Sequence, residues 1–308
     1  MTFLERALEL AERGRGTTHP NPVVGAVVVR DGDVIGEGWH RRAGGPHAEA
    51  VALEQAGGRA RRATLYVTLA PCSRHGRTTP CVDAIVAAGV ARVVVGADDP
   101  TQDGIERLRE RGVEVELVDS SAARRQNEAW LTWATLGRPF VTYKVAVSVD
   151  GRVTVPGSRW VSGEESRRLV HALRARSDAV AVGMGTFRAD RPTLTARDVA
   201  VVRQPRRLVF GSGPVPDGFE LVSGPLEDAL QALGAEGVQS LLLEGGPTLA
   251  TSFLRAGLVD KMVVFVAPVV SGAGPRFVGE LGEPVRLHGF DARTAGDDVV
   301  LSAYVHAP

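Results

Sequence analysis

Cysteine and lysine are both rare in this sequence of 308 residues. The two cysteines, Cys72 and Cys81, are too few for the disulfide framework that stabilises many small secreted domains. Of the 36 basic residues only Lys144 and Lys261 are lysines, so arginine carries the positive charge almost everywhere else. A lysine retained against that bias suggests a position that uses a compact ammonium group instead of a planar guanidinium group.

An excess of charge and a long apolar run are also missing. The 36 acidic residues balance the 36 basic ones, so the chain lacks the basic excess of a nucleic-acid-binding protein. No apolar run approaches the roughly 20 residues of a membrane span. The N-terminus becomes charged at Glu5 and Arg6, without the apolar segment of a signal peptide. We therefore expect a cytoplasmic protein with no nucleic-acid or membrane partner, long enough for two domains.

Both cysteines belong to a motif that begins with His47 and Glu49. One histidine and two thiolates can hold Zn²⁺ with a fourth position open for water, and an unligated glutamate can move protons. His47-x-Glu49 fits the deaminase pattern, but Cys72 and Cys81 are nine positions apart, so the loop between them is longer than in that pattern. Either half alone is more often accidental, a chance H-x-E or two buried free thiols. The combination in this order predicts a zinc-dependent deaminase.

Helices and strands are expected to alternate along the first half. Thr2-x-x-Glu5 predicts a capping box for the first helix. Residues 36–40 (Gly36-Glu37-Gly38-Trp39-His40) are expected to lead through a glycine-rich loop to His47, where a helix over 48–56 begins. A strand over 64–69 leads into the cysteine loop. This alternation predicts a mostly parallel sheet covered by helices, with its site at the carboxyl ends of strands.

The second half shows a different arrangement of strands and turns. Residues 119–138 are expected to be a polar start followed by an aromatic-bearing helix. The domain boundary is expected here, close to Pro139, although a helix that merely closes the first domain is also compatible. A strand over 140–148 follows. Ser162-x-x-Glu165 predicts a second capping box. Strands over 179–183 and 240–243 are apolar enough to be buried in the middle of a sheet.

Each of these two buried strands runs into a glycine turn. The turns are Gly183-Met184-Gly185-Thr186 and Glu244-Gly245-Gly246-Pro247-Thr248. A glycine turn between a strand and a helix presents backbone N–H groups at the positive end of a helix dipole, which favours an anion. Taken alone, each turn is more often purely structural, and no G-x-G-x-x-G pattern accompanies them.

These motifs resemble the bifunctional deaminase–reductase family of riboflavin biosynthesis. The resemblance rests on Asn21-Pro22-Val23-Val24-Gly25, on residues 36–40, on His47-Ala48-Glu49, and on Gly76-Arg77-Thr78 ahead of Pro80-Cys81, and it continues through the second half. It implies an α/β fold with a cytidine-deaminase-like three-layer α/β/α domain over 1–138 and a dihydrofolate-reductase-like α/β domain over 139–308.

The resemblance also implies the reaction. Zinc-dependent hydrolytic deamination of 2,5-diamino-6-(ribosylamino)pyrimidinone 5′-phosphate would be followed by NADPH-dependent reduction of the ribosyl group to a ribityl chain. The partner would be a small phosphorylated pyrimidine, and the protein would form a homodimer or homotetramer.

Site residues carry over by position. The family resemblance implies Zn²⁺ ligation by His47, Cys72 and Cys81, and proton transfer by Glu49 and Lys144. The alternative for Lys144 is an ordinary strand lysine whose ammonium group extends to solvent. The implied NADPH contacts are Ala146, Trp160, Thr186, Asp190, Ser212, Gly246, Pro247, Thr248, Leu249, Ala250, Thr251 and Ser252. The implied substrate contacts are His40, Arg77, Ser158, Arg174, Leu194, Arg197 and Glu244.

The sequence departs from the family pattern at a few positions. Ala70 and Arg74 replace a usual glutamate and histidine beside Cys72, the loop after Pro100 is short, and Gly211 replaces a common aspartate. These differences keep a second hypothesis open, a reductase whose zinc-stabilised deaminase domain is catalytically impaired. A third, a nucleic-acid base deaminase with an attached binding module, is disfavoured by the zero net charge.

Overall fold

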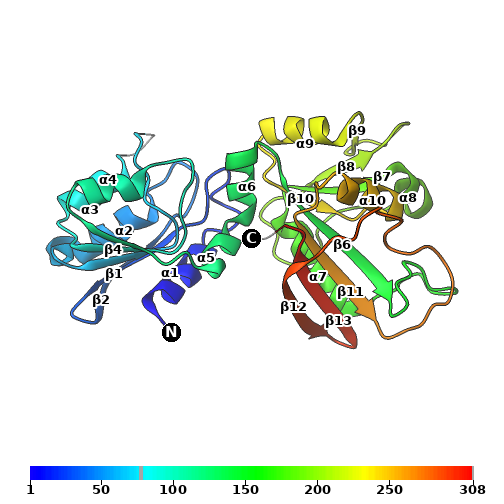
Figure 1. The fold of residues 1–308 in the computed structure, drawn as a ribbon, viewed down its shortest axis with the longest axis horizontal. Coiled ribbons are helices and arrows are strands. Elements are labelled where there is room, and N and C mark those ends of the chain that lie inside the picture. The colour runs from blue at the N-terminus through cyan, green and yellow to red at the C-terminus, as the bar shows by residue number, and fades with distance from the viewer. Residues whose placement is uncertain (76–78, 307–308) are drawn as a thin grey trace. The chain divides into compact units, whose positions relative to one another are not determined.

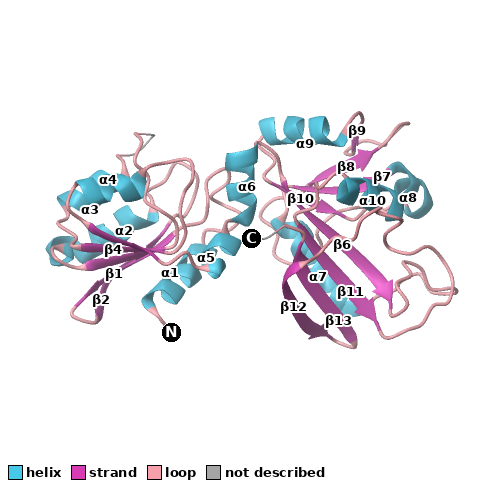
Figure 2. Ribbon diagram, in the orientation of Figure 1, coloured by secondary structure: helices cyan, strands magenta, loops and turns pink. Residues whose placement is uncertain are grey.

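The structure is a computed structural model that describes residues 1–75 and 79–306. The chain divides into two compact units, Met1–Leu136 and Gly137–Pro308. Each unit has its own β-sheet and its own hydrophobic core (Figures 1 and 2). Within the described residues, no helix is long and apolar enough to cross a membrane.

The first unit is built on a five-stranded sheet with the order β2-β1-β3-β4-β5. Strand β1 pairs antiparallel with both β2 and β3, whereas β3, β4 and β5 run parallel. The sheet is therefore mixed: β2, β3, β4 and β5 share one direction, as the prediction of a mostly parallel sheet requires, and β1 runs against them. The strands are β1 (Gly25–Arg30), β2 (Asp33–Trp39), β3 (Thr64–Val67), β4 (Arg92–Val95) and β5 (Glu114–Leu117).

Helices cover both faces of this sheet. One core cluster joins the apolar sides of α2, α3 and α4 to the side chains of β1, β3 and β4 that face them. Side chains of α1, α5 and α6 pack on the opposite face. The unit thus has three layers, as predicted, and its helices are α1 (Phe3–Glu12), α2 (Ala48–Ala56), the short 3₁₀ helix η1 (Gly57–Ala60), α3 (Cys81–Ala87), α4 (Gly104–Glu110), α5 (Ser121–Gln126) and α6 (Glu128–Leu136).

Local predictions for this unit agree with the structure at three points. The capping box at Thr2 and Glu5 is present, and α2 has the predicted bounds. Residues 36–39 are the second half of β2, and the predicted loop follows them as far as His47. Gly36 allows close packing, because a Cβ atom there would lie 2.2 Å from the carbonyl oxygen of Ala52 in α2. The glycine here brings a strand against a helix instead of forming a turn.

The second unit is built on an eight-stranded sheet with the order β12-β13-β11-β6-β10-β7-β8-β9. Strands β11, β6, β10, β7, β8 and β9 are parallel, and the β12–β13 hairpin adds an antiparallel edge. The predicted strands β6, β7 and β10 lie in the interior of the sheet. The strands are β6 (Phe140–Ser148), β7 (Ala179–Gly183), β8 (Arg206–Phe210), β9 (Glu220–Val222), β10 (Ser240–Leu243), β11 (Lys261–Ala267), β12 (His288–Ala295) and β13 (Asp298–Tyr304).

Two helices pack on each face of this sheet. Helices α9 (Leu226–Ala235) and α10 (Pro247–Arg255) contribute to the core cluster on one face. Helices α7 (Glu164–Arg176) and α8 (Met184–Asp190) contribute to the clusters on the other. The predicted capping box at Ser162 was wrong, since α7 begins at Glu164 and its N-cap is Gly163. The N–H of Gly163 donates to Asp298 Oδ2 (2.7 Å), a partner remote in sequence.

A buried ion pair anchors the start of β6. The guanidinium group of Arg138 donates two hydrogen bonds of 2.8 Å to the carboxylate of Asp260. Asp260 Oδ2 also accepts the N–H of Val141 (2.7 Å). The two charged side chains are only 11% and 10% exposed, so neither is well solvated without the other.

We predict that Arg138→Ala lowers the free energy of unfolding of the second unit by about 3 kcal/mol, because it leaves a buried carboxylate without its counter-ion. Urea unfolding followed by circular dichroism measures this loss. The control is Arg107→Ala, which breaks an exposed pair with Asp103 and should cost less than about 0.5 kcal/mol. Equal losses in the two variants would contradict the role given to burial.

Candidate functional site

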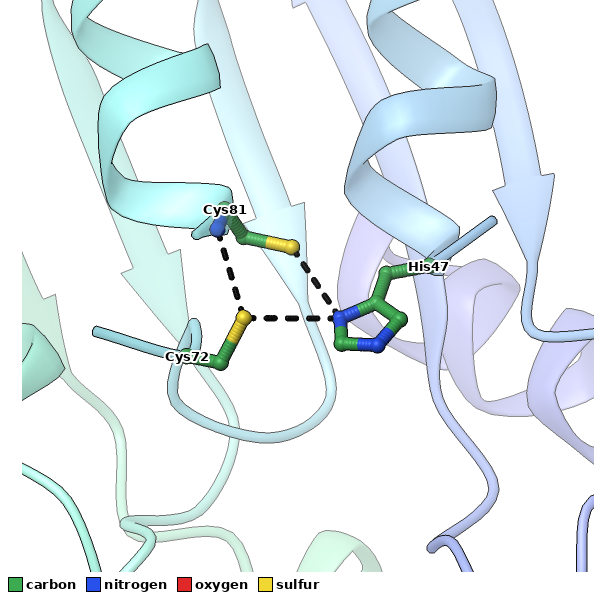
Figure 3. Close-up of side chains that lie close together, drawn as sticks. All are labelled: His47, Cys72 and Cys81. Carbon is green, nitrogen blue, oxygen red and sulfur yellow. Dashed lines mark hydrogen bonds between the residues drawn. The ribbon is translucent and has the colours of Figure 1, made fainter. Parts of the chain in front are cut away.

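Three residues from separate elements meet at one edge of the first sheet. His47 is the N-cap residue of α2, Cys72 lies in the loop after β3, and Cys81 is the first residue of α3. Figure 3 shows the three side chains pointing toward one another. Their ligand atoms all lie within 4.8 Å of one another.

The donor set and its spacing fit zinc. His47 Nδ1 lies 3.4 Å from Cys72 Sγ and 3.3 Å from Cys81 Sγ. In a tetrahedral site with usual Zn–S and Zn–N bond lengths, the nitrogen and sulfur ligands are about 3.6 Å apart. One imidazole and two thiolates leave a fourth position of the tetrahedron for water or substrate.

The two thiols are not electrostatically equivalent. A hydrogen bond with the Cys81 side chain lowers the pKa of Cys72 to about 4, despite the opposing effect of burial. The same interaction, with burial, raises the pKa of Cys81. His47 has a raised pKa because its ring shares a hydrogen bond with Cys72. The protein alone therefore holds one thiolate and the second proton is released when a metal binds.

Glu49 lies next to this group, but its carboxylate is not among the ligand groups that converge. It is on the first turn of α2, and only 3% of its surface is exposed. Burial raises the pKa of its carboxyl group, which also interacts with Cys81 and His47. A buried carboxyl group beside an open ligand position is suited to hold and transfer a proton.

His40 lies close to His47, with 5.4 Å between the ring centroids. Its ring is buried and both nitrogens have partners, because Nδ1 is 3.0 Å from the carbonyl oxygen of Pro46 and Nε2 is 3.1 Å from Asn21 Nδ2. Burial lowers the pKa of His40, which favours a neutral ring that donates to Pro46 and accepts from Asn21. His40 therefore orients Asn21, a residue absent from the predicted site.

Sequence reasoning also missed the support of the cysteine loop. Gln102 Oε1 accepts the N–H of Ser73 (2.9 Å) and the N–H of Arg74 (3.4 Å). Gly104 permits close approach, since a Cβ atom there would lie 1.8 Å from the carbonyl oxygen of Pro71. The short segment after Pro100 thus fixes the backbone around Cys72. The predicted substrate contact Arg77 lies outside the described residues.

In the second unit, Glu244 is the centre of a buried charge cluster. Its carboxylate accepts hydrogen bonds from Arg174 Nε (2.6 Å) and Arg174 Nη2 (2.8 Å), and Lys144 Nζ lies 3.4 Å from Oε2. Burial alone would raise the pKa of Glu244, but the charge of Lys144 and the hydrogen bonds of Arg174 outweigh it and lower the pKa to about 2. The structure thus brings together three of the residues assigned to substrate and catalysis.

The two glycine turns also meet. The N–H of Gly246 donates to Thr186 Oγ1 (3.0 Å), which links the turn before α10 to the start of α8. A Cβ atom at Gly246 would lie 2.7 Å from that oxygen, so the position requires glycine. Pro247 occupies the first turn of α10 and the N-cap Gly246 makes no side-chain cap, which leaves the helix terminus open to an anion.

The remaining predicted residues occupy varied environments. Ala146 lies on the same face of β6 as Lys144, and Ser158 Oγ bonds to the backbone of Trp160, whose ring is exposed. Leu194 and Ala250 are buried. The side chains of Thr251 and Ser252 bond to carbonyl groups one turn earlier in α10. The other predicted contacts are exposed or half-exposed, namely Asp190, Arg197, Ser212, Pro247, Thr248 and Leu249.

A three-layer unit with a His-Cys-Cys centre, joined to a unit with glycine turns at parallel strand ends, defines a zinc-dependent deaminase fused to a nucleotide-dependent reductase. Family profiles agree with both halves. The profile described as the cytidine and deoxycytidylate deaminase zinc-binding region matches residues 1–97. The profile described as the RibD C-terminal domain matches residues 139–301.

The chain belongs to the RibD family of bifunctional riboflavin biosynthesis proteins, which use Zn²⁺ and NADPH. It is 39% identical to the riboflavin biosynthesis protein RibD of Aquifex aeolicus over 97% of this chain and 96% of that protein. It is likewise 39% identical to RibD of Escherichia coli over 89% of each. The resemblance stated from the sequence motifs is thereby confirmed.

Solved structures give the same result. Form 1 of RibD from Acinetobacter baumannii is 34% identical and superposes with a TM-score of 0.88. The match covers 98% of this chain and 97% of that chain. The Thermotoga maritima protein, described as a diaminohydroxyphosphoribosylaminopyrimidine deaminase/5-amino-6-(5-phosphoribosylamino)uracil reductase, is 33% identical with a TM-score of 0.85 and the same coverage. The predicted combination of a deaminase-like and a reductase domain is confirmed.

The Glu244 cluster predicts a pH dependence of stability. Its pKa falls from an ordinary value of 4.5 to about 2 on folding, which corresponds to roughly 3 kcal/mol. The stabilisation is complete above pH 4.5 and is lost as the pH falls toward 2. The difference in free energy of unfolding between the unsubstituted protein and Glu244→Gln should therefore narrow over that range. Glu164→Gln, at an exposed position, should show a small difference at every pH.

Proposed function

We propose that the protein performs two consecutive reactions on one small phosphorylated pyrimidine. Residues 1–138 would deaminate 2,5-diamino-6-(ribosylamino)pyrimidinone 5′-phosphate, and residues 139–308 would then reduce its ribosyl group to a ribityl chain. The observation that carries the proposal is the convergence of His47, Cys72 and Cys81 beside the buried Glu49. The substrate class is the one named for the Thermotoga maritima relative.

In the deaminase reaction, His47, Cys72 and Cys81 hold Zn²⁺. When bound, zinc acts as a Lewis acid that lets water serve as a nucleophile near neutral pH. Glu49 accepts a proton from that water and later delivers it to the departing amine, so that ammonia leaves while a ring carbonyl forms. Gln102, which accepts the N–H of Ser73, restrains the backbone next to Cys72.

In the reductase reaction, the glycine turn at Gly246 and the start of α8 receive the cofactor phosphates. When bound, NADPH supplies a hydride for C1′ of the ribose. Lys144 donates a proton to the ring oxygen as the bond between that oxygen and C1′ breaks. Glu244 holds the ammonium group of Lys144 and the guanidinium group of Arg174 in position, and Arg174 binds the substrate phosphate.

The partner, the location and the oligomeric state of the protein are also part of the proposal. The zero net charge supports a free small molecule as partner and disfavours nucleic acid. We infer a cytoplasmic homodimer or homotetramer, and the exposed side chains of Leu287, Phe290 and Val299 along the β12–β13 edge provide apolar surface for such an assembly.

Glu49→Gln should abolish ammonia release, with a loss of at least about 100-fold, because the amide cannot transfer the proton. Ammonia is measured with the diaminopyrimidinone phosphate, and zinc by atomic absorption. Zinc content and NADPH oxidation with deaminated substrate should be unchanged. Loss of zinc would instead make Glu49 a ligand. Absence of ammonia with the unsubstituted protein, but oxidation of NADPH with deaminated substrate, would establish the reductase with an impaired deaminase domain.

Lys144→Met should produce the reverse result, with ammonia release retained and NADPH oxidation reduced by about 100-fold. The matched control is Lys261→Met, which removes the other lysine, whose Nζ donates to the Tyr304 hydroxyl group. That variant should retain both activities. If Lys144→Met oxidised NADPH at the unchanged rate, another group, or water, would protonate the ring oxygen.

A further inference from the structure

The loop between α8 and β8 carries two of the substrate contacts that the family resemblance implies. It spans residues 191–205, and Leu194 and Arg197 lie in it. Leu194 has a φ of 53°, in the left-handed region that residues other than glycine rarely adopt. Its side chain is only 1% exposed and belongs to the core cluster that includes Val182. A backbone in this conformation persists only where the surrounding structure holds it.

Side chains bind the backbone of this loop directly before Arg197. The amide group of Gln204 makes two hydrogen bonds to Ala196, because Oε1 accepts the N–H (3.0 Å) and Nε2 donates to the carbonyl oxygen (2.9 Å). Arg174 Nη1, from α7, donates to the carbonyl oxygen of Thr195 (3.1 Å). These three hydrogen bonds leave the N–H of Arg197 as the next polar group of the backbone.

His171, also on α7, contacts this part of the loop through one ring nitrogen. Its Nδ1 lies 3.3 Å from the backbone nitrogen of Arg197 and 3.2 Å from the carbonyl oxygen of Thr195. One nitrogen cannot accept from an N–H group and donate to a carbonyl oxygen at the same time. Because Arg174 already donates to the Thr195 carbonyl oxygen, the favoured arrangement uses Nδ1 as the acceptor for Arg197 and places the ring proton on Nε2.

The surroundings of His171 favour this neutral ring. Burial lowers the pKa of His171 most strongly, and the charges of Arg174, from the same helix, and Arg197, from the loop, lower it further. The carbonyl oxygen of Thr195 and the charge of Asp198 oppose these effects without outweighing them. A ring that gained a proton on Nδ1 would lose the lone pair that accepts the N–H of Arg197. It would also add a positive charge beside two guanidinium groups.

We propose that His171 is a positioning residue of the reductase, whose neutral ring holds the backbone of Arg197 in the conformation that binds the substrate. Protonation of His171 releases this backbone and weakens substrate binding. The residue touches neither the hydride donor nor C1′, so the effect is on the KM for the substrate and not on kcat. The inference rests on the proposed reductase reaction, in which Leu194 and Arg197 contact the substrate.

Two substitutions of the full chain separate the acceptor from the bulk of the ring. His171→Phe keeps a ring but removes the acceptor. His171→Asn keeps an acceptor that cannot be protonated, because its amide oxygen is the same number of bonds from the backbone as Nδ1. At about pH 7.5 the KM for deaminated substrate should rise about 5-fold in His171→Phe and less than about 2-fold in His171→Asn, the scale of one hydrogen bond. Equal KM values in the two variants would overturn the proposal.

The pH profile tests the proton itself and does not depend on His171→Phe being folded. The substrate phosphate also titrates near about pH 6, so the comparison is with His171→Asn, which shares that titration. From about pH 7.5 to about pH 5, the KM of the unsubstituted protein should rise about 5-fold more than that of His171→Asn. Gln204→Leu loosens the loop but keeps the histidine, so its KM should be higher throughout with the same pH dependence as the unsubstituted protein. Parallel profiles for the unsubstituted protein and His171→Asn would overturn the role of protonation.

Ring nitrogen signals test the hydrogen bond without activity. In protein with ¹⁵N-labelled histidine, His171 is the one of seven histidines whose signals are missing from His171→Asn. At about pH 7.5 its Nε2 should carry the proton and its Nδ1 should have the shift of an accepting nitrogen. A proton on Nδ1 would overturn the inference. Failure of the unsubstituted protein to oxidise NADPH would contradict the reductase proposal, while these signals decide separately whether His171 holds Arg197.

Discussion

The direction of the strands is the constraint on which both sites depend. In the first unit β1 is antiparallel to β2 and to β3, so β2 and β3 run in the same direction and end at the same edge. His47 follows β2 and Cys72 follows β3, which explains how residues 25 positions apart become ligands of one centre. In the second unit the strands β6, β10, β7 and β8 are parallel, so their carboxyl ends lie at one edge of the sheet. Lys144, Glu244, Thr186 and Ser212 are brought toward that edge in the same way.

Charge compensation then determines which charged groups can be buried. Buried carboxylates are matched closely, Asp260 by Arg138 and Glu244 by Arg174 and Lys144, because an unmatched buried charge would be costly. The first pair holds the start of β6, whereas the second group lies among the residues proposed to bind and reduce the substrate.

Short-range patterns predicted much of the fold. The bounds of α2, β6, β7 and β10 follow from periodicity and apolar runs, and the metal centre follows from residue types that have few other joint uses. Long-range contacts set what could not be predicted. Gly36 is in a strand because α2 packs on it, and Asp298 instead of Ser162 contacts the start of α7.

The departures from the family pattern can now be placed. Ala70 is buried with its N–H bonded to the carbonyl oxygen of Ala97, and Arg74 is exposed with its N–H directed to Gln102. Neither residue belongs to the group of His47, Cys72 and Cys81 whose ligand atoms converge. The short loop after Pro100 supplies Gln102, so it supports the cysteine loop instead of weakening it. The three changes therefore leave the convergence of His47, Cys72 and Cys81 intact.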